Sequence, residues 1–204
     1  PRQPVRLLLA LGVQLVHRVG VLLSQPGMAG GNALGKIFSG KINPSGRLTD
    51  TWAFHYQDYP SSENFSHNNG NTDDEYYKEG IYVGYRYYDA FGVEPEYPFG
   101  YGLGYTTFAQ KIVAGKIEGK VVTFDVEVIN TGKLRGKEVV EVYVSAPEGN
   151  IDKPYQELKA WAKSGMLLPG EAETVSISFD ISKCASYDTS KASRILEKGD
   201  YLIR

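Results

Sequence analysis

The stretch VVTFDVEVIN, residues 121–130, decides the fold class of this chain. Apolar side chains occupy every second position of its central part: Val122, Phe124, Val126 and Val128. Polar side chains stand between them, at Thr123, Asp125 and Glu127. Because successive side chains of a strand point to opposite faces, this alternation predicts a β-strand that covers a core on one side.

Two further segments repeat this pattern. Their alternating apolar residues are Val140, Val142, Val144, Val175, Ile177, Phe179 and Ile181. Turn-forming stretches rich in Gly, Pro and Asn separate the segments, at residues 130–136, 146–154 and 167–173. Several short alternating strands with such turns, and no helical period, are typical of a β-sandwich of the immunoglobulin or fibronectin type III kind.

Length and charge limit the remaining classes of function. The chain has 204 residues and a formal net charge of -2. Since domains typically run about 100–200 residues, it can bury one ordinary core or two small ones. The small net charge gives no electrostatic reason to expect a nucleic-acid partner. The single cysteine, Cys184, excludes an internal disulfide framework and is interpreted as a small buried apolar residue.

The beginning of the chain differs in kind from the rest. No Asp or Glu precedes Asp50, and residues 7–16 form an apolar run. This run is shorter than the ~20 residues that a transmembrane helix needs, so we expect no membrane partner. A buried strand or helix within a larger fold is favoured over a secretory signal. The compartment stays open, with the cytoplasm favoured over secretion.

A short helix is predicted from Asn32, with Asn32 as its N-cap and Gly40 as its C-terminal stop. The residues that fit one helix face are Ala33, Leu34, Ile37 and Phe38. The following NPSG, residues 43–46, predicts a turn with positive φ at Gly46. Residues 56–107 then form a polar region rich in tyrosine. We expect this region to be a long ordered loop rather than a flexible linker.

Five stretches, in this order, resemble the C-terminal half of the glycoside hydrolase family 3 enzymes, the β-glucosidase-like proteins. They are GGNALGKIFSGKINPSGRL, KEGIYVGYRYYDAFG, YPFGYGLGYTTF, NTGKLRGKEVVEVYV and ELKAWAKSGMLLPGEAETVSISF. The resemblance covers about residues 26–204. It implies a retaining glycosidase without a cofactor, which acts on a β-glucoside or related glycoside. It also implies a barrel, then an α/β sandwich domain, then a fibronectin type III-like domain.

By this resemblance the chain divides into three parts. Residues 1–55 correspond to the end of the α/β sandwich domain, residues 56–107 to a Tyr-rich connecting region, and residues 108–204 to the fibronectin type III-like domain. Residues 1–24 fit the family least, because they lack the acids and aromatics that this part ordinarily carries. We therefore expect the sequence to begin inside a longer protein, with residues 1–24 out of frame or wrongly joined.

The resemblance places the catalytic groups outside this sequence. Glycoside hydrolysis usually needs two carboxyl groups that flank the scissile bond. The family nucleophile is an aspartate of the barrel, and a barrel of about 250 residues does not fit into this chain. The acid/base carboxylate lies upstream of GGNAL, where this sequence has no acid. We assign no catalytic and no metal-binding residue, leave substrate binding unassigned, and expect the chain to be inactive alone.

Other candidate residues have simpler interpretations. The acidic residues of the Tyr-rich region are Asp73, Asp74, Glu75, Glu79 and Asp89. Adjacent acids in a polar loop are typical of a solvated face, and the spacing of a calcium loop is absent. His55 and His67 lack a nucleophile at a recognisable motif, so we expect structural roles. Asn64 begins a formal glycosylation sequon, NFS.

The aromatic stretch at residues 97–108 has two interpretations. Packing between two domains is favoured over direct stacking on a sugar. The alternative for the whole chain is a non-catalytic carbohydrate-binding or structural β-sandwich module. Because large exposed aromatic patches drive association, we also expect self-association of the chain, or partial disorder of residues 56–99.

Overall fold

The computed structural model describes residue 25 and residues 27–204. It divides into two compact units, residues 1–42 and residues 43–204, which are described separately. The expectations for residues 1–24, including the apolar run at residues 7–16, fall outside the described residues. No helix in the described part of the chain is long and apolar enough to cross a membrane.

The first unit contains one described helix, α1 (Gly30–Phe38). It begins before Asn32, and Ala29 occupies the N-cap position without a side-chain hydrogen bond, so the predicted Asn32 cap is wrong. The backbone starts the first turn itself, because the Gly30 N–H donates to the Gly27 carbonyl at 3.1 Å. The predicted stop is confirmed: Gly40 has a φ of 72°, and its N–H donates to the carbonyl of Ile37 at 2.9 Å.

The predicted turn at residues 43–46 is also wrong. Gly46 is not among the glycines with positive φ, and residues 43–48 form no turn. This stretch instead leads into a two-stranded backbone pairing. Leu48 donates to the Tyr101 carbonyl at 2.8 Å, and Trp52 donates to the Tyr97 carbonyl at 2.8 Å. Extended backbone satisfies these long-range hydrogen bonds, which outweigh the local turn preference of NPSG.

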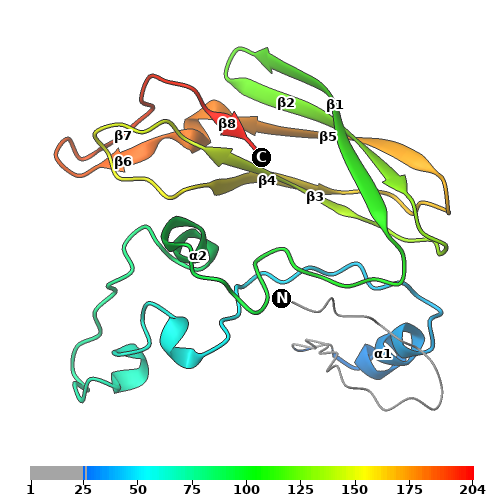
Figure 1. The fold of residues 1–204 in the computed structure, drawn as a ribbon, viewed down its shortest axis with the longest axis horizontal. Helices are drawn as coiled ribbons and strands as arrows, with labels where there is room; N and C mark the ends of the chain where they lie inside the picture. The colour runs from blue at the N-terminus through cyan, green and yellow to red at the C-terminus, as the bar shows by residue number, and fades with distance from the viewer. Residues whose placement is uncertain (1–24, 26) are drawn as a thin grey trace. The chain divides into compact units, whose positions relative to one another are not determined.

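Residues 108–204 form two antiparallel sheets, shown in Figure 1, and a short hairpin. The first sheet, of order β1-β2-β5, consists of β1 (Phe108–Glu118), β2 (Val121–Asn130) and β5 (Ala172–Asp180). The second sheet, of order β4-β3-β8, consists of β4 (Glu157–Lys163), β3 (Val139–Ser145) and β8 (Leu202–Ile203). The hairpin pairs β6 (Ser186–Asp188) with β7 (Ser193–Ile195). These sheets confirm the predicted β-sandwich.

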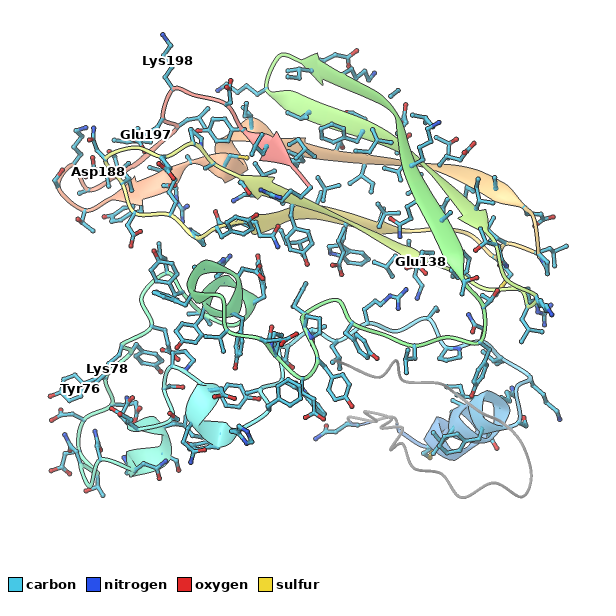
Figure 2. The ribbon with its side chains drawn as sticks, in the orientation of Figure 1. Tyr76, Lys78, Glu138, Asp188, Glu197 and Lys198 are labelled. Atoms are coloured by element: carbon cyan, nitrogen blue, oxygen red, sulfur yellow. The ribbon has the colours of Figure 1, made fainter. Side chains whose placement is uncertain are left out.

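The alternating residues of β2, β3 and β5 form the core between the sheets (Figure 2). Its buried members are Val122, Val126, Val128, Val140, Val142, Val144, Leu167, Val175, Ile177, Phe179 and Cys184. Phe124 is only half-buried against this core, and Ile181 is half-buried in the 3-10 turn η3 (Ile181–Cys184). The prediction of a buried Cys184 is confirmed, and burial raises the pKa of its thiol.

The Tyr-rich region contains two 3-10 turns and a short helix. They are η1 (Tyr56–Asp58), η2 (Phe65–His67) and α2 (Tyr85–Phe91). Helix α2 packs on the second sheet, since the ring of Tyr85 lies 5.7 Å from the ring of Tyr143 in β3. The Leu158 N–H of β4 donates to the Tyr85 hydroxyl at 2.8 Å. This region is thus attached to the sandwich by α2.

Two tyrosines of α2 have opposite hydrogen-bonding states, and this difference can be measured. The Tyr88 hydroxyl is buried and has no hydrogen-bond partner among the described residues, whereas the Tyr85 hydroxyl accepts from Leu158. We expect Tyr88→Phe to be neutral or to raise the free energy of unfolding by about 1 kcal/mol, and Tyr85→Phe to lower it by about 0.5–1.5 kcal/mol. Urea unfolding of both variants checks this. Equal losses would contradict it.

Tyr88 also predicts how the stability of the chain depends on pH. Burial raises the pKa of Tyr88 from 10.0 to about 12. Between these values the folded state keeps a proton that the unfolded state releases, so stability falls as the pH rises through this window. Tyr88→Phe should therefore flatten the alkaline loss of stability. An unchanged alkaline slope in the variant would contradict the assignment to Tyr88.

Candidate functional site: a pocket at the base of the β-sandwich

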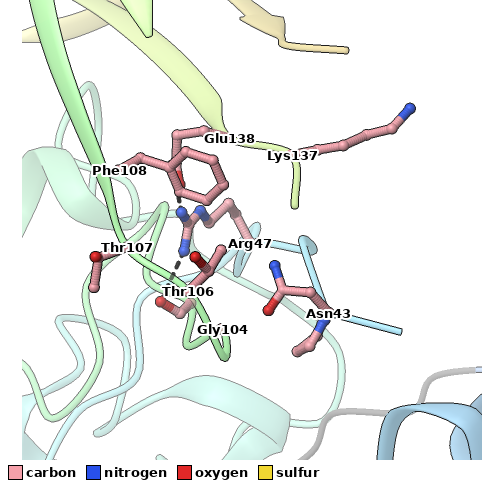
Figure 3. Close-up of a pocket in the computed structure, with 10 residues that line it drawn as sticks. Asn43, Arg47, Gly104, Thr106, Thr107, Phe108, Lys137 and Glu138 are labelled. Atoms are coloured by element: carbon pink, nitrogen blue, oxygen red, sulfur yellow. Dashed lines mark hydrogen bonds and ion pairs between the residues drawn. The ribbon is translucent and has the colours of Figure 1, made fainter. Parts of the chain in front are cut away.

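A pocket of about 230 Å³ lies where three segments of the second unit meet (Figure 3). Residues 43–47 form one wall, residues 102–108 form another, and Lys137 and Glu138 precede β3 on the third side. The first two walls follow from the backbone pairing of residues 48–52 with residues 96–101. This pairing holds the two walls next to each other.

Arg47 joins all three walls. One terminal nitrogen of its guanidinium, Nη1, donates to the Gly102 carbonyl at 2.7 Å. The other, Nη2, forms an ion pair with the Glu138 carboxylate, as the dashed lines of Figure 3 show. The side chain of Glu138 is only 10 % exposed. A planar guanidinium with several fixed donors suits this two-directional contact better than an ammonium group.

Two further contacts close the base of the pocket. Asn43 accepts from the Tyr105 N–H through its side-chain oxygen at 2.5 Å. A Cβ atom added at Gly102 would lie 2.6 Å from the Gly46 carbonyl oxygen, so only glycine permits this approach. The aromatic stretch therefore needs Gly102 where it crosses the segment that carries Arg47.

Asn130 anchors the neighbouring turn from inside the sandwich. Its side chain is fully buried, and its oxygen accepts from the Thr106 hydroxyl at 2.8 Å and from the Gly132 N–H at 3.1 Å. Its amide nitrogen donates to the carbonyls of Leu134, at 2.8 Å, and Leu167, at 2.9 Å. The full hydrogen-bonding capacity of one amide group is thus used to hold three loops.

The pocket lacks the groups for glycoside hydrolysis. Among its lining residues, all of them described, Glu138 is the one carboxylate, and Arg47 neutralises it. A glycosidase needs two carboxyl groups about 5–9.5 Å apart. The nearby Lys163 donates to the Ser45 carbonyl at 2.8 Å, and burial, with Lys137 and Arg47 close by, lowers the pKa of its ammonium. These contacts hold the three segments together, so the pocket has a structural role.

Comparison with known proteins identifies the two ends of the chain separately. A model of the glycosyl hydrolase family 3 C-terminal domain matches residues 17–85. A model of the fibronectin type III-like domain matches residues 138–204. The chain thus resembles the C-terminal part of glycoside hydrolase family 3.

Relatives and solved structures agree with this assignment. The chain is 44% identical to beta-glucosidase A of Butyrivibrio fibrisolvens, over 87% of its own length and 24% of the relative. It is 39% identical to thermostable beta-glucosidase B of Acetivibrio thermocellus, with 87% and 23% covered. Beta-glucosidase 3B of Thermotoga neapolitana, solved with α-D-glucose, matches with a TM-score of 0.81 and 43% identity, over 86% of this chain and 24% of that one. The chain thus spans about a quarter of the length of these relatives.

The acidic residues that the sequence singled out lie at structural contacts of the second unit. Backbone N–H groups of Asp73 and Asp74 donate to the side-chain oxygen of Asn71, at 3.0 and 3.1 Å. Asp89 accepts from Gln156 at 2.9 Å and so helps to attach α2 to the sandwich. Glu75 accepts from Asn64, and Glu79 contributes its backbone carbonyl to a turn. No three His, Cys, Asp or Glu side chains of the described residues are grouped to hold a metal.

The glycosylation motif at Asn64 is not accessible in the folded chain. Asn64 is 2% exposed, and its amide nitrogen donates to the Tyr76 carbonyl at 2.8 Å. A glycan on that nitrogen would have to replace this hydrogen bond. His67 places its Nδ1 at 2.8 Å from the Asn71 carbonyl, and the His55 N–H donates to Asp58 at 3.0 Å, which are structural contacts.

Sequence reasoning missed Arg47, Glu138 and Asn130. Arg47 and Glu138 stand 91 residues apart, and no local pattern links them. The sequence places Asn130 at the start of a turn. A signal for its role was present, because an Asn that ends an alternating strand and precedes Thr and Gly often bonds through its side chain to the turn backbone.

Proposed function

We propose that the chain is a non-catalytic C-terminal portion of a β-glucosidase-like enzyme, and that it does not hydrolyse glycosides alone. The observation that carries the proposal is the share of each protein that aligns: 87% of this chain but only 24% of beta-glucosidase A. A barrel of about 250 residues, the size that would hold the family nucleophile, exceeds the chain itself. The longer protein would act on a β-glucoside or related glycoside, as the names of the relatives indicate.

We propose that each part of the chain has a structural role. Residues 1–55 would be the end of an α/β sandwich domain, and the family-model match at residues 17–85 supports this. Residues 56–107 would connect it to the fibronectin type III-like domain at residues 108–204. The ion pair between Arg47 and Glu138 supports an ordered connection within residues 43–204, because it ties the segment before the Tyr-rich region to the residue that precedes β3.

Self-association also belongs to this proposal. Large side chains of the Tyr-rich region are exposed, among them Tyr77, Phe65 and Phe91. Tyr76 lies at the outer side of this region (Figure 2). Such apolar area favours association with a second copy or with the remainder of the longer protein.

The test is an assay of the purified chain with an aryl β-glucoside. We expect release of the phenol at the rate of buffer alone, because the pair of carboxyl groups is missing. The matched controls are Asp73→Asn and Asp74→Asn, which alter the most concentrated acids of the chain. Turnover that survives purification and is lost in either variant would overturn the proposal. Calorimetric titration with glucose separates it from the alternative of a carbohydrate-binding module, which predicts measurable heat of binding.

A further inference from the structure

Asn69 is the one asparagine of the sequence that a glycine follows. Both residues are exposed, in the turn that comes directly after η2. Gly70 has a φ of 77°, and a Cβ atom built on it would meet nothing within 4 Å. Its N–H donates to the His67 carbonyl at 2.9 Å, and this hydrogen bond leaves the faces of the peptide plane free. Water and hydroxide can therefore reach the peptide nitrogen of Gly70.

The side chain of Asn69 folds back onto the backbone that follows it. Its oxygen accepts a hydrogen bond from the Asn71 N–H at 3.0 Å, which is the contact of an Asx turn. The Gly70 nitrogen is a member of the ring that this hydrogen bond closes, so the side-chain carbonyl is held beside it. The Asn71 N–H also polarises this carbonyl, and it would stabilise negative charge on the oxygen as a donor of an oxyanion hole does.

We propose that Asn69 is a site of spontaneous deamidation, with the Gly70 nitrogen as nucleophile. Hydroxide removes the proton of the Gly70 N–H, and the nitrogen attacks the side-chain carbonyl carbon of Asn69. The new carbon–nitrogen bond closes a five-membered succinimide ring, and the side-chain nitrogen takes up a proton and leaves as ammonia. Water then opens the ring at either carbonyl. The net reaction consumes water and releases ammonia, without oxidation or reduction.

The two products change the turn in different ways. Opening at the side-chain carbonyl leaves an aspartyl residue, which adds a negative charge to the turn that carries Asp73 and Asp74. Opening at the backbone carbonyl leaves an isoaspartyl residue, in which Cβ becomes part of the main chain. The longer main chain then lies inside the turn that the hydrogen bond from Gly70 to His67 closes. All groups that react or assist lie within residues 67–71, so the reaction needs no residue beyond either end of this sequence.

Three other asparagines lack what the reaction needs. Asn43 precedes Pro44, whose nitrogen carries no proton to lose and so cannot become the nucleophile. Asn64 is 2% exposed and Asn130 is fully buried. The amide nitrogens of both donate to backbone carbonyls, which retain the group that would have to leave.

The test follows the purified full chain at mildly alkaline pH, folded and in urea. Tandem mass spectrometry of tryptic peptides assigns each exchange of amide for acid to one asparagine. We expect Asn69 to convert at least about tenfold faster than Asn71, and no slower in the folded chain than in urea, because the turn holds the carbonyl beside its nucleophile. Equal conversion of both asparagines, or slower conversion of Asn69 in the folded chain than in urea, would overturn the proposal.

Thr72→Gly is the matched variant, because Asn71 differs from Asn69 mainly in the residue that follows. The Asn71 side-chain oxygen accepts two backbone N–H groups, from Asp73 and Asp74, at 3.0 and 3.1 Å. Thr72 is β-branched and crowds its own nitrogen. We expect Thr72→Gly to speed conversion of Asn71 at least about tenfold. An unchanged rate at Asn71 would contradict the role assigned to the backbone donors and to glycine.

Asn69→Gln supplies the second variant. Glutamine would have to close a six-membered ring, which forms more slowly, while its amide group keeps the polarity of the turn. Enzymatic methylation of isoaspartate in the aged chain should therefore fall at least about tenfold in this variant, with the Tm of the parent chain retained. Isoaspartate that persists at the parent level would place the reaction at another residue and overturn the proposal.

Discussion

Replacing Phe179 by alanine is expected to lower the free energy of unfolding by about 3–5 kcal/mol. Phe179 is 4% exposed and pairs with Val122 across β2 and β5. Its ring lies in the core that joins the two sheets. Truncation removes this buried apolar area and leaves a cavity, because β5 cannot move inward without breaking its ladder with β2.

Phe54→Ala is the matched control for this variant. Phe54 is 53% exposed, so the same truncation should cost less than about 1 kcal/mol. Phe124→Ala should fall between the two, because its ring is only half-buried against the core and water can enter where the ring was. Urea unfolding followed by circular dichroism measures all three. Similar losses for Phe179 and Phe54 would show that the assigned core face is wrong.

Arg47→Met is expected to cost about 3–5 kcal/mol, the range for removing one partner of a buried ion pair. The change leaves the Glu138 carboxylate, 10% exposed, without its cation. It also removes the donor that the Gly102 carbonyl receives at 2.7 Å. Methionine keeps much of the length of the arginine stem, so the loss reports mainly on the charge and the hydrogen bonds.

The double variant Arg47→Met, Glu138→Leu separates these contributions. With both charges removed no buried carboxylate remains unpaired, and most of the lost stability should return. Denaturant unfolding of the parent, the two single variants and the double variant completes the cycle. A double variant as unstable as Arg47→Met would assign the loss to packing rather than to the ion pair.

The strands that the sequence predicted are those with one buried and one solvated face. In β2, β3 and β5 this division appears in the sequence as an alternation of apolar and polar residues. Val126, Val142 and Ile177 could therefore be assigned to the core from the sequence. Strands β1 and β4 were not predicted. β1 has almost all its residues exposed, and only the first is half-buried, so no burial pattern constrains its sequence.

The pocket was less predictable for a different reason. Its defining contacts join residues far apart in the chain, as with Arg47 and Glu138 or with Asn43 and Tyr105. Local propensity also failed where tertiary hydrogen bonds competed with it, because residues 43–46 carry turn chemistry yet lead into extended pairing. Family resemblance identified these stretches as motifs but gave no account of the contacts that they make.

The backbone pairing of residues 48–52 with residues 96–101 closes the chain between them into a loop whose two ends are fixed. Changes in the length of that loop do not move its ends. The entropy of closing a flexible loop grows only with the logarithm of its length, and a doubling costs about 0.6 kcal/mol. Insertions at the exposed turn around Asn69 would therefore cost the rest of the unit little, and this segment is where new sequence could be acquired without disturbing the sandwich.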